Sequence, residues 1–246
     1  MKIEGRNAVA ELIKTDKTID KILVQNGMRD EPSRTLVKEA VKRGFKVQYS
    51  EKAILDKESE TRRHQGFIAY VSDYVYAETE DLIAACENKN DSLIVVLDGV
   101  EDVHNLGSIA RVCECAGADG LIIGKRRSAQ INETVMRISE GACNHLKTAR
   151  VTNINQTLDQ LKKAGFWCYA LEVGGDEITK TNLTGKTVLV VGGEDTGVNR
   201  LTKEKCDGVV SIKMQGKVNS LNASVACGVA VFEVMRQRDA KTSGRI

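Results

Sequence analysis

From residue 92 onward, short apolar segments alternate with segments of helical periodicity, and this alternation restricts the fold more than any other feature of the sequence. The apolar segments predict strands at 93–97, 121–123, 167–171, 187–191 and 209–212. The periodic segments predict helices at 109–116, 134–139 and 158–164, and a strongly apolar helix at 223–235. Such alternation is typical of a mostly parallel sheet covered by helices, so an α/β fold is expected.

The first 75 residues show a separate pattern, that of a small α/β unit. Its predicted helices lie at 7–13 and 33–43, and its predicted strands lie at 19–24, 46–49 and 66–71. Residues 76–91 then carry five acidic residues and one lysine, which marks a change in composition. We therefore expect a domain at 1–75, a linker at 76–91 and a second domain at 92–246, which suits a chain of 246 residues.

Composition and cysteine usage disfavour several classes of protein. Hydrophobic residues make up 41% and charged residues 28%, as in ordinary globular domains. The N-terminus lacks an apolar signal core, and no apolar run approaches the ~20 residues that a membrane span needs. The seven cysteines form no C-x-x-C pair, and the three histidines are isolated in the sequence. A cytoplasmic protein with free thiols, no membrane association and no metal is expected.

Three of the predicted strands end in unusual loops. Ligands of open α/β sheets bind at the carboxyl ends of strands, so these loops are candidate sites. The loop after 97 carries Asn105, a predicted helix N-cap, and Arg111. The loop after 191 is rich in glycine around Glu194. The loop after 212 holds small polar residues, including Ser220 and Asn222, next to a predicted helix start.

The glycine-rich loops do not fit the common nucleotide-binding motifs. The loop after 191 lacks the Gly-Lys-Ser/Thr ending of a phosphate-binding P-loop, and no G-x-G-x-x-G opens a helix after the first strand. ATP hydrolysis and NAD chemistry are therefore disfavoured. Taken singly, each loop is also explained as an ordinary turn between a strand and a helix, with Ser220 as an N-cap.

Taken together and in order, the three loops resemble the three motifs of the SpoU (TrmH) family of RNA ribose 2′-O-methyltransferases. Motif 1 resembles Asn105-x-Gly107-x-x-x-Arg111, motif 2 resembles Gly193-Glu194-x-x-Gly197, and motif 3 resembles residues 212–226. The similarity extends through 4–9 and 125–132 and covers nearly the whole chain. It is greatest to the branch that methylates a guanosine ribose in 23S rRNA.

The resemblance implies a SPOUT-type catalytic domain whose C-terminal segment forms a trefoil knot, binds S-adenosylmethionine there and works as a homodimer. It also implies an L30e-like, RNA-binding N-terminal domain. The cofactor contacts that it implies come from Gly193, Glu194, Ile212, Met214, Ser220 and Leu221. The apolar helix at 223–235 suits burial in a subunit interface.

The chemistry of ribose methylation fits the residues that the resemblance marks as catalytic. A ribose 2′-OH is a weak nucleophile, so the site must orient it and favour its deprotonation. The family role of Arg111 is general base or activator. Because a guanidinium rarely loses its proton, we favour a cation that lowers the pKa of the hydroxyl and binds the neighbouring phosphate; a base role requires a strongly perturbed site. Glu194 is expected to hold or polarise Arg111 or Asn105. Ser220 and Asn222 are expected to fix the loop or, alternatively, to cap the helix.

Basic side chains form the candidate RNA-binding surface. Arg34, Lys38 and Lys42 fall four apart on one face of a predicted helix, although a solvated face explains the same spacing. The remaining candidates are Arg62, Arg63, Lys125, Arg126 and Arg127, the last three nearer the active site. Because the ribose hydroxyl is the same in every RNA, substrate choice is expected to reside in residues 1–75.

Two positions depart from the family pattern. Lys213 stands where the family usually has proline, and Asp195 stands where it usually has glycine, so the cofactor loop is expected to differ. The sequence therefore predicts a homodimeric, S-adenosylmethionine-dependent 2′-O-methyltransferase acting on 23S rRNA. The alternatives are a tRNA ribose 2′-O-methyltransferase and a non-catalytic RNA-binding or ribosome-assembly factor.

Overall fold

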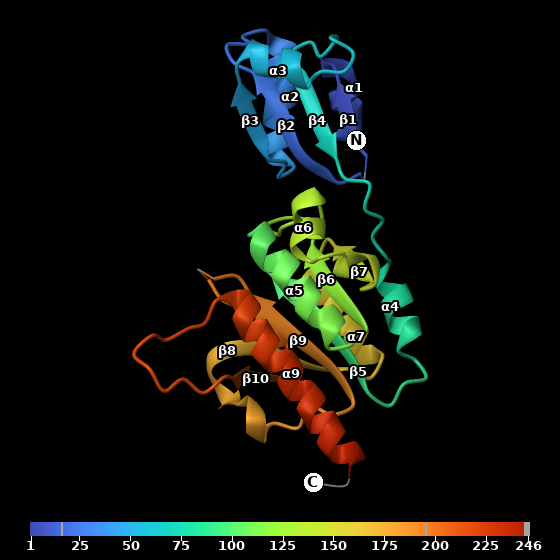
Figure 1. Cartoon of the computed structure of the whole chain (residues 1–246), viewed down its shortest axis with the longest axis vertical. Helices are drawn as coiled ribbons and strands as arrows, with labels where there is room; N and C mark the ends of the chain where they lie inside the picture. The colour runs from blue at the N-terminus through green and yellow to red at the C-terminus, as the bar shows by residue number, and fades with distance from the viewer. Residues whose placement is uncertain (16, 195, 244–246) are drawn as a thin grey trace. The chain divides into compact units, whose positions relative to one another are not determined.

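The computed structural model describes residues 1–15, 17–194 and 196–243, and the chain divides into two compact units (Figure 1). The first unit is Met1–Val75 and the second is Tyr76–Ile246. Asp195, one of the two departures from the family pattern, lies outside the described residues. Each unit has its own sheet and its own apolar core.

The first unit is a four-stranded sheet covered by helices on both faces. Its strands are β1 (Lys2–Glu4), β2 (Ile19–Gln25), β3 (Val47–Ser50) and β4 (Phe67–Val71), in the order β1-β4-β2-β3. Its helices are α1 (Arg6–Leu12), α2 (Glu31–Lys42) and α3 (Lys52–Glu58). Strand side chains alternate between the faces: Phe67 packs in a core with residues of α1 and α2, and Ile68 packs against Leu55 of α3.

Periodicity in the sequence predicted most of the helices and strands of the first unit. The predicted helices and strands at 7–13, 19–24, 33–43, 46–49 and 66–71 agree with α1, β2, α2, β3 and β4 to within two residues at each end. Helix α2 begins earlier than predicted because Asp30 caps it, accepting a hydrogen bond from the Ser33 amide at 3.1 Å, with a proline in its first turn. Strand β1, with three residues, is too short to show periodicity, and helix α3 was not predicted because four of its seven residues are charged.

The second unit is a six-stranded sheet in which every neighbouring pair is parallel, which confirms the predicted α/β fold. Its strands are β5 (Ser92–Asp98), β6 (Gly120–Gly124), β7 (Thr148–Val151), β8 (Trp167–Glu177), β9 (Lys186–Gly192) and β10 (Gly208–Ser211), in the order β10-β8-β9-β5-β6-β7. Its helices are α4 (Thr79–Ala85), α5 (Val103–Cys115), α6 (Glu133–Ile138), α7 (Ile154–Lys163), α8 (Arg200–Lys205) and α9 (Ala223–Thr242), with short 3₁₀ turns at Ala142–Asn144 and Ile178–Lys180.

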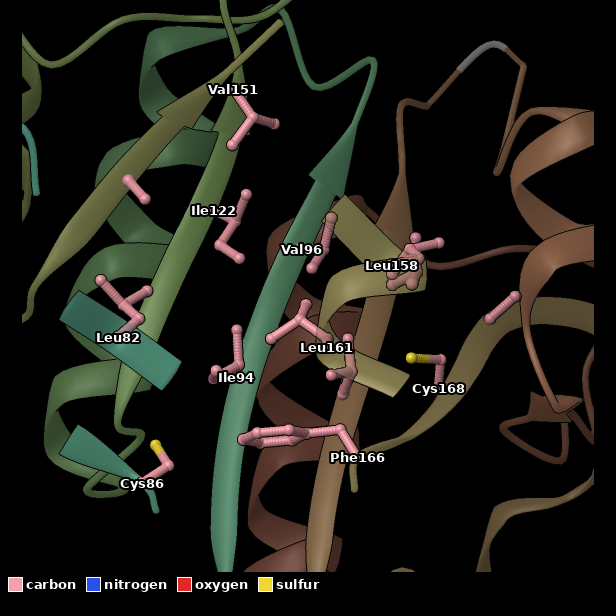
Figure 2. Close-up of a cluster of buried hydrophobic side chains, with 14 of the residues drawn as sticks. Leu82, Cys86, Ile94, Val96, Ile122, Val151, Leu158, Leu161, Phe166 and Cys168 are labelled. Carbon is pink, nitrogen blue, oxygen red and sulfur yellow. The ribbon is translucent and has the colours of Figure 1, made fainter. Parts of the chain in front are cut away.

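Helices cover both faces of this sheet. Figure 2 shows one face, where Ile94 and Val96 of β5 pack with Leu158 of α7 in a cluster that includes Phe166. Residues Leu93, Val95 and Leu97 alternate with these and are also fully buried, so they face the opposite side. Helices α5 and α9 contact each other there (Figure 1). Strand β5 is therefore buried on both faces, which explains its continuous apolar run.

The predicted linker at 76–91 is instead built into the second unit. It contains α4, whose Leu82 is fully buried, as is Cys86 just after the helix. The amide of Ala77 also donates to the Thr148 carbonyl at 2.9 Å. The acidic side chains that suggested a tether include those of a capping box, in which Glu78 and Asp81 bond each other's backbone amides. A helix of seven residues shows too little periodicity to be recognised in so acidic a segment.

Other elements of the second unit also differ from the prediction. Helices α5 and α7 begin earlier than the predicted 109 and 158, and α9 extends past the predicted 235. Strand β8 continues past 171 to Glu177, because the glycines that look like strand breakers let β10 approach closely: a Cβ on Gly175 would lie 2.5 Å from the Val209 carbonyl oxygen. Strand β7 was missed because it has only four residues, and helix α8 because five of its six residues are polar. All seven cysteines are free. Across the described residues, no helix has both the length and the apolar character of a membrane span.

Candidate functional site

A cavity of about 300 Å³ opens at the carboxyl ends of the central strands of the second unit. The six residues predicted to contact a cofactor all line it: Gly193, Glu194, Ile212, Met214, Ser220 and Leu221. They come from the loop after β9 and from the segment between β10 and α9. The sequence therefore located the walls that these two loops contribute.

Close backbone packing shapes the glycine-rich side of the cavity. A Cβ on Gly192 would lie 2.0 Å from the carbonyl carbon of Gly197, and one on Gly193 would lie 2.3 Å from the carbonyl oxygen of Gly99. The loop after β9 thus folds back on itself and lies against the loop after β5, with the Gly197 amide donating to the Gly193 carbonyl at 2.9 Å. Any larger residue at Gly192 would require the backbone to move.

The third wall of the cavity comes from β8 and was missed. Leu171, Glu172 and Val173 line it, because β8 lies between β9 and β10 and continues past the level at which β9 ends. The Glu172 carboxylate accepts a hydrogen bond from the Val198 amide at 3.0 Å and lies 3.6 Å from the ammonium of Lys203. The same rule about strand ends, applied to this strand, identifies these residues. Other lining residues not predicted are Val191, Gly192, Thr196, Gly197, Ala223 and Ala226.

Three polar side chains, one from each motif loop, meet beside the cavity. The Asn105 side-chain amide donates to Glu194 Oε1 at 3.1 Å, and the Asn222 side-chain amide donates to Asn105 Oδ1 at 2.9 Å. Asn222 also donates to Glu194 Oε1. Hydrogen bonds to a charged carboxylate are stronger than those between neutral groups, so Glu194 fastens the other two loops to its own.

Of the side chains predicted to cap helices, Asn222 does so, whereas Ser220 and Asn105 do not. Asn222, not Ser220, caps α9: its Oδ1 accepts from the amides of Ser224 at 3.0 Å and Val225 at 3.3 Å. Asp102, not Asn105, caps α5, accepting from the His104 amide at 2.6 Å. Asn105 therefore lies inside the first turn of α5, which frees its side chain to reach Glu194. Ser220 remains exposed on the rim of the cavity.

Arg111 is paired with Glu140 and forms no hydrogen bond or ion pair with Glu194 among the described residues. Its Nη1 donates to Glu140 Oε1 at 2.7 Å, and 51% of its side chain is exposed. Arg111 follows Asn105 by six positions in α5, roughly 9 Å along the helix axis. Of the two predicted partners of Glu194, the structure thus brings Asn105 to it, whereas Arg111 pairs with Glu140 just after α6.

A buried carboxylate that the sequence did not single out anchors the loop after β9. Asp98, at the end of β5, is 6% exposed. Its carboxylate accepts from the backbone amide of Asn199 at 2.9 Å and from the Asn199 side chain at 2.7 Å, and its carbonyl accepts from the Gly193 amide at 3.1 Å. Asp98 therefore holds both ends of the stretch that runs from the cavity to α8.

The candidate RNA-binding residues are exposed. Arg34, Lys38 and Lys42 lie on the outer face of α2, and the side chains after β6 and before β4 are also exposed: Lys125, Arg126, Arg127, Arg62 and Arg63. The turn after β6 is held by Gln130, which donates to the Gly124 carbonyl at 2.9 Å. Among the described residues, no group of three or more His, Cys, Asp or Glu side chains is placed to hold a metal ion.

A parallel sheet with a cavity and a polar cluster at its strand ends is the arrangement in which α/β proteins usually bind small ligands. Residues 92–232 match the SpoU rRNA Methylase family, and residues 2–77 match the RNA 2′-O ribose methyltransferase substrate-binding domain. The chain belongs to the SpoU family of RNA 2′-O-methyltransferases, which confirms the predicted family.

Individual relatives agree with this assignment. The chain is 40% identical, over 96% of its length and 95% of the relative, to YacO of Bacillus subtilis (strain 168), which is assigned to the TrmH family of tRNA/rRNA methyltransferases. The SpoU methyltransferase AviRb from Streptomyces viridochromogenes, solved with AdoMet, shares the fold (TM-score 0.63, 23% identity, 98% of this chain and 91% of that one). The A. aeolicus TrmH/SpoU tRNA modifying enzyme aligns with 67% of this chain and 84% of its own (TM-score 0.57, 31% identity).

Proposed function

We propose that this protein transfers a methyl group from S-adenosylmethionine to the ribose 2′-oxygen of a guanosine in 23S rRNA, in the cytoplasm. The observation that carries the proposal is the meeting of Asn105, Glu194 and Asn222 beside the cavity. The three residues come from three separate motif loops. Family membership supports the reaction class.

The cavity fits the proposed cofactor in size and in chemistry. Its volume, about 300 Å³, is at the lower end of the range for small-ligand pockets, about 300–1,000 Å³. Leu171, Ile212 and Leu221 offer apolar surface to an adenine ring, and the carboxylates of Glu172 and Glu194 favour a cationic group. S-adenosylmethionine, when bound, supplies a sulfonium methyl that a ribose oxygen can attack. Gly193 and Gly197 line the cavity without a side chain, which leaves room for the ligand.

Arg111 is the proposed activator of the ribose. Its pair with Glu140 is largely exposed, and exposed pairs contribute only about 0–1 kcal/mol, so an RNA phosphate can replace Glu140 at little cost. The guanidinium then stabilises negative charge that develops on the 2′-oxygen and binds the adjacent phosphate. Asn105 and Glu194 hold the start of α5 and the loop after β9 together. Ser220, on the rim of the cavity, is proposed to complete the loop that holds the cofactor.

The RNA assignment rests on the first unit. The match of residues 2–77 to a substrate-binding domain supports an RNA-reading role, and an L30e-like fold is proposed for the domain at 1–75. The basic side chains of α2 and of the loop before β4 are the proposed phosphate contacts. A ribosomal substrate is favoured over tRNA because a separate RNA-reading unit suits recognition at a distance from the methylated ribose. A tRNA substrate is the second candidate, supported by the tRNA/rRNA assignment of the relatives.

A homodimer formed through α9 is part of the proposal. Val225, Val229 and Phe232 of this helix are 51%, 44% and 53% exposed in the single chain, and they recur at helical spacing. Apolar surface of this kind is expected to be covered by a second copy. The trefoil knot of the C-terminal segment stays a prediction.

Methylation mapping tests the proposed reaction and its substrate together. Ribose methylation of total RNA is compared between cells with and without the gene, and the purified full chain is then supplied with S-adenosylmethionine and either 23S rRNA or tRNA. We expect one 2′-O-methylguanosine to disappear from 23S rRNA in the deleted strain and to be restored by the purified protein. Loss of a tRNA methylation instead supports the second candidate. No change in either RNA favours the non-catalytic assembly factor.

A further inference from the structure

The loop at 59–66 of the first unit joins α3 to β4 and carries Arg62 and Arg63. Both side chains are exposed, and neither guanidinium has an ion-pair partner within the described part of the chain. Arg62 has a φ of 58° and Gln65 a φ of 48°, values that cost a residue with a side chain roughly 1–2 kcal/mol. A loop with two such residues keeps its shape only if its surroundings hold it.

The Glu4 carboxylate, at the end of β1, holds the first half of this loop. It accepts hydrogen bonds from the Ser59 hydroxyl at 2.7 Å, from the Glu60 amide at 2.6 Å and from the Thr61 amide at 3.3 Å. The Thr61 hydroxyl also donates to it. Four donors from three consecutive loop residues therefore converge on one side chain.

The hydroxyl groups of Ser59 and Thr61 also bond the backbone amides of the two arginines. The Arg62 amide donates to the Ser59 hydroxyl oxygen at 2.8 Å, and the Arg63 amide donates to the Thr61 hydroxyl oxygen at 3.2 Å. A hydroxyl has one proton and two lone pairs. Because each proton is directed to Glu4, the lone pairs are left to receive the arginine amides.

Because Glu4 is ionised, it accepts all of these hydrogen bonds and the loop donates them. Burial by itself raises the pKa of Glu4, but hydrogen bonds from Thr61, Ser59 and the backbone outweigh it and lower the pKa to about 2. A carboxylate that stays ionised near neutral pH only accepts hydrogen bonds.

The second half of the loop is fixed independently. His64 is buried, with Nε2 2.9 Å from Asp56 Oδ1 and with Nδ1 accepting from the Gly66 amide at 3.0 Å. Gln65 Oε1 accepts from the Arg6 amide at 3.3 Å. The two arginines thus lie between two anchored ends.

We propose that Glu4 is a positioning residue for RNA: acting through Ser59 and Thr61, it sets the backbone from which Arg62 and Arg63 contact the phosphates of the substrate. This inference rests on the proposed function, since it requires that the first unit binds RNA. Guanidinium groups bind phosphate best when their position is fixed in advance, because less conformational entropy is lost on binding. It also gives a role to the motif at 4–9, which the active site leaves unused.

The sign of the effect of Glu4→Gln distinguishes positioning from simple electrostatics. Removing a negative charge from an RNA-binding unit should strengthen RNA binding, because phosphates are repelled less. Loss of positioning predicts the opposite, since a glutamine has one acceptor oxygen and presents an NH₂ group to the remaining donors. We expect the affinity of the full chain for a 23S rRNA fragment to fall roughly 3- to 10-fold, as when about one phosphate contact is weakened. Glu39→Gln, which removes the same charge from the same unit but contacts Arg43 instead, should bind RNA as well as the unaltered chain or better.

A double-mutant cycle shows whether Glu4 acts through the arginines. RNA affinity is measured for Glu4→Gln, for Arg62→Ala combined with Arg63→Ala, and for all three changes together. If Glu4 only positions these side chains, its substitution has little further effect once they are removed. Full additivity of the effects would overturn the inference.

Ser59→Ala and Thr61→Val keep the test informative if Glu4→Gln unfolds the unit. Each removes one hydroxyl between Glu4 and an arginine amide and leaves the carboxylate in place, so each should weaken RNA binding in the same direction. Cofactor affinity, measured by calorimetry, should not change in any of these variants. Unchanged RNA affinity in all three single variants contradicts the inference even if the double arginine variant binds weakly. Failure of the unaltered chain to methylate RNA contradicts the proposed function itself.

Discussion

The side-chain amide of Asn222 donates to Asn105 Oδ1 at 2.9 Å, although the two residues are 117 positions apart. The same Asn222 caps α9 through its oxygen, so one side chain joins the helix start to the polar cluster beside the cavity. The two halves of its amide therefore have separate roles, and substitutions can separate them.

Asn222→Asp keeps the capping oxygen but replaces the donating group with a second carboxylate oxygen beside Glu194. Asn222→Ala removes both the cap and the link. We expect Asn222→Ala to lower the free energy of unfolding by about 1 kcal/mol, from the lost cap. Both variants should reduce methyl transfer at least ~10-fold, since each breaks the link to Glu194. Thermal unfolding and transfer of labelled methyl groups measure the two effects. Near-normal activity of Asn222→Asp would show that only the cap matters.

Arg111→Ala should lower the rate of methyl transfer about 100-fold or more while leaving cofactor affinity nearly unchanged, because Arg111 does not line the cavity. Glu140→Gln is the matched control, since it removes the partner of Arg111 and keeps the guanidinium. We expect that variant to retain activity. Single-turnover rates and calorimetry provide the measurements. A large loss of cofactor affinity in Arg111→Ala contradicts an RNA-facing role.

Asp98→Asn should loosen the loop after β9, because it places one amide NH₂ group against that of Asn199. The expected cost is about 1–3 kcal/mol in the free energy of unfolding, together with weaker cofactor binding. Adding Asn199→Asp exchanges the two side chains and restores a donor and an acceptor, so the double variant should recover much of both losses. Denaturant titration and calorimetry of the three variants test the exchange. No recovery in the double variant indicates that Asp98 acts otherwise than through Asn199.

A fragment of residues 76–246 should fold and bind S-adenosylmethionine, whereas a fragment of residues 92–246 should not fold stably. The shorter fragment exposes the core that Leu82 covers, and removal of a buried leucine alone costs roughly 2–5 kcal/mol. Circular dichroism and calorimetry on both fragments provide the comparison. Equal stability of the two would show that α4 is dispensable.

Sedimentation of the full chain at micromolar concentration should show a dimer. Val229→Asp combined with Phe232→Asp should give a folded monomer, because both side chains are about half exposed in the single chain and tolerate charge there. Leu201→Asp, at an exposed apolar residue of α8, is the control and should remain dimeric. A monomeric unaltered chain contradicts the proposed interface.

Apolar runs and strand-end loops allowed five of the six strands of the second unit and six cavity residues to be predicted. The helix α4 escaped prediction because its seven residues show only about two turns of periodicity and lie in an acidic segment. Contacts between distant segments escaped for another reason. The pairing of Asp98 with Asn199, 101 positions away, and that of Arg111 with Glu140 depend on how helices and loops pack, which no local pattern reveals. Asn105 was expected to be a cap because its type favours caps, but Asp102 occupies that position.

The parallel pairing of β5 with β9 also has a consequence for biosynthesis. Ser92 lies opposite Lys186, so β5 leaves the ribosome long before β9 has been synthesised. At about 5–20 residues per second, the edge of β5 that β9 later covers stays open for roughly 5–20 seconds of translation. The first unit, complete within residues 1–75, can fold during that interval, whereas limited proteolysis of nascent chains arrested before 186 should still cleave the second. Until β9 has been synthesised, protection of the unpaired edge of β5 from association with other chains therefore depends on the cell as well as on the sequence.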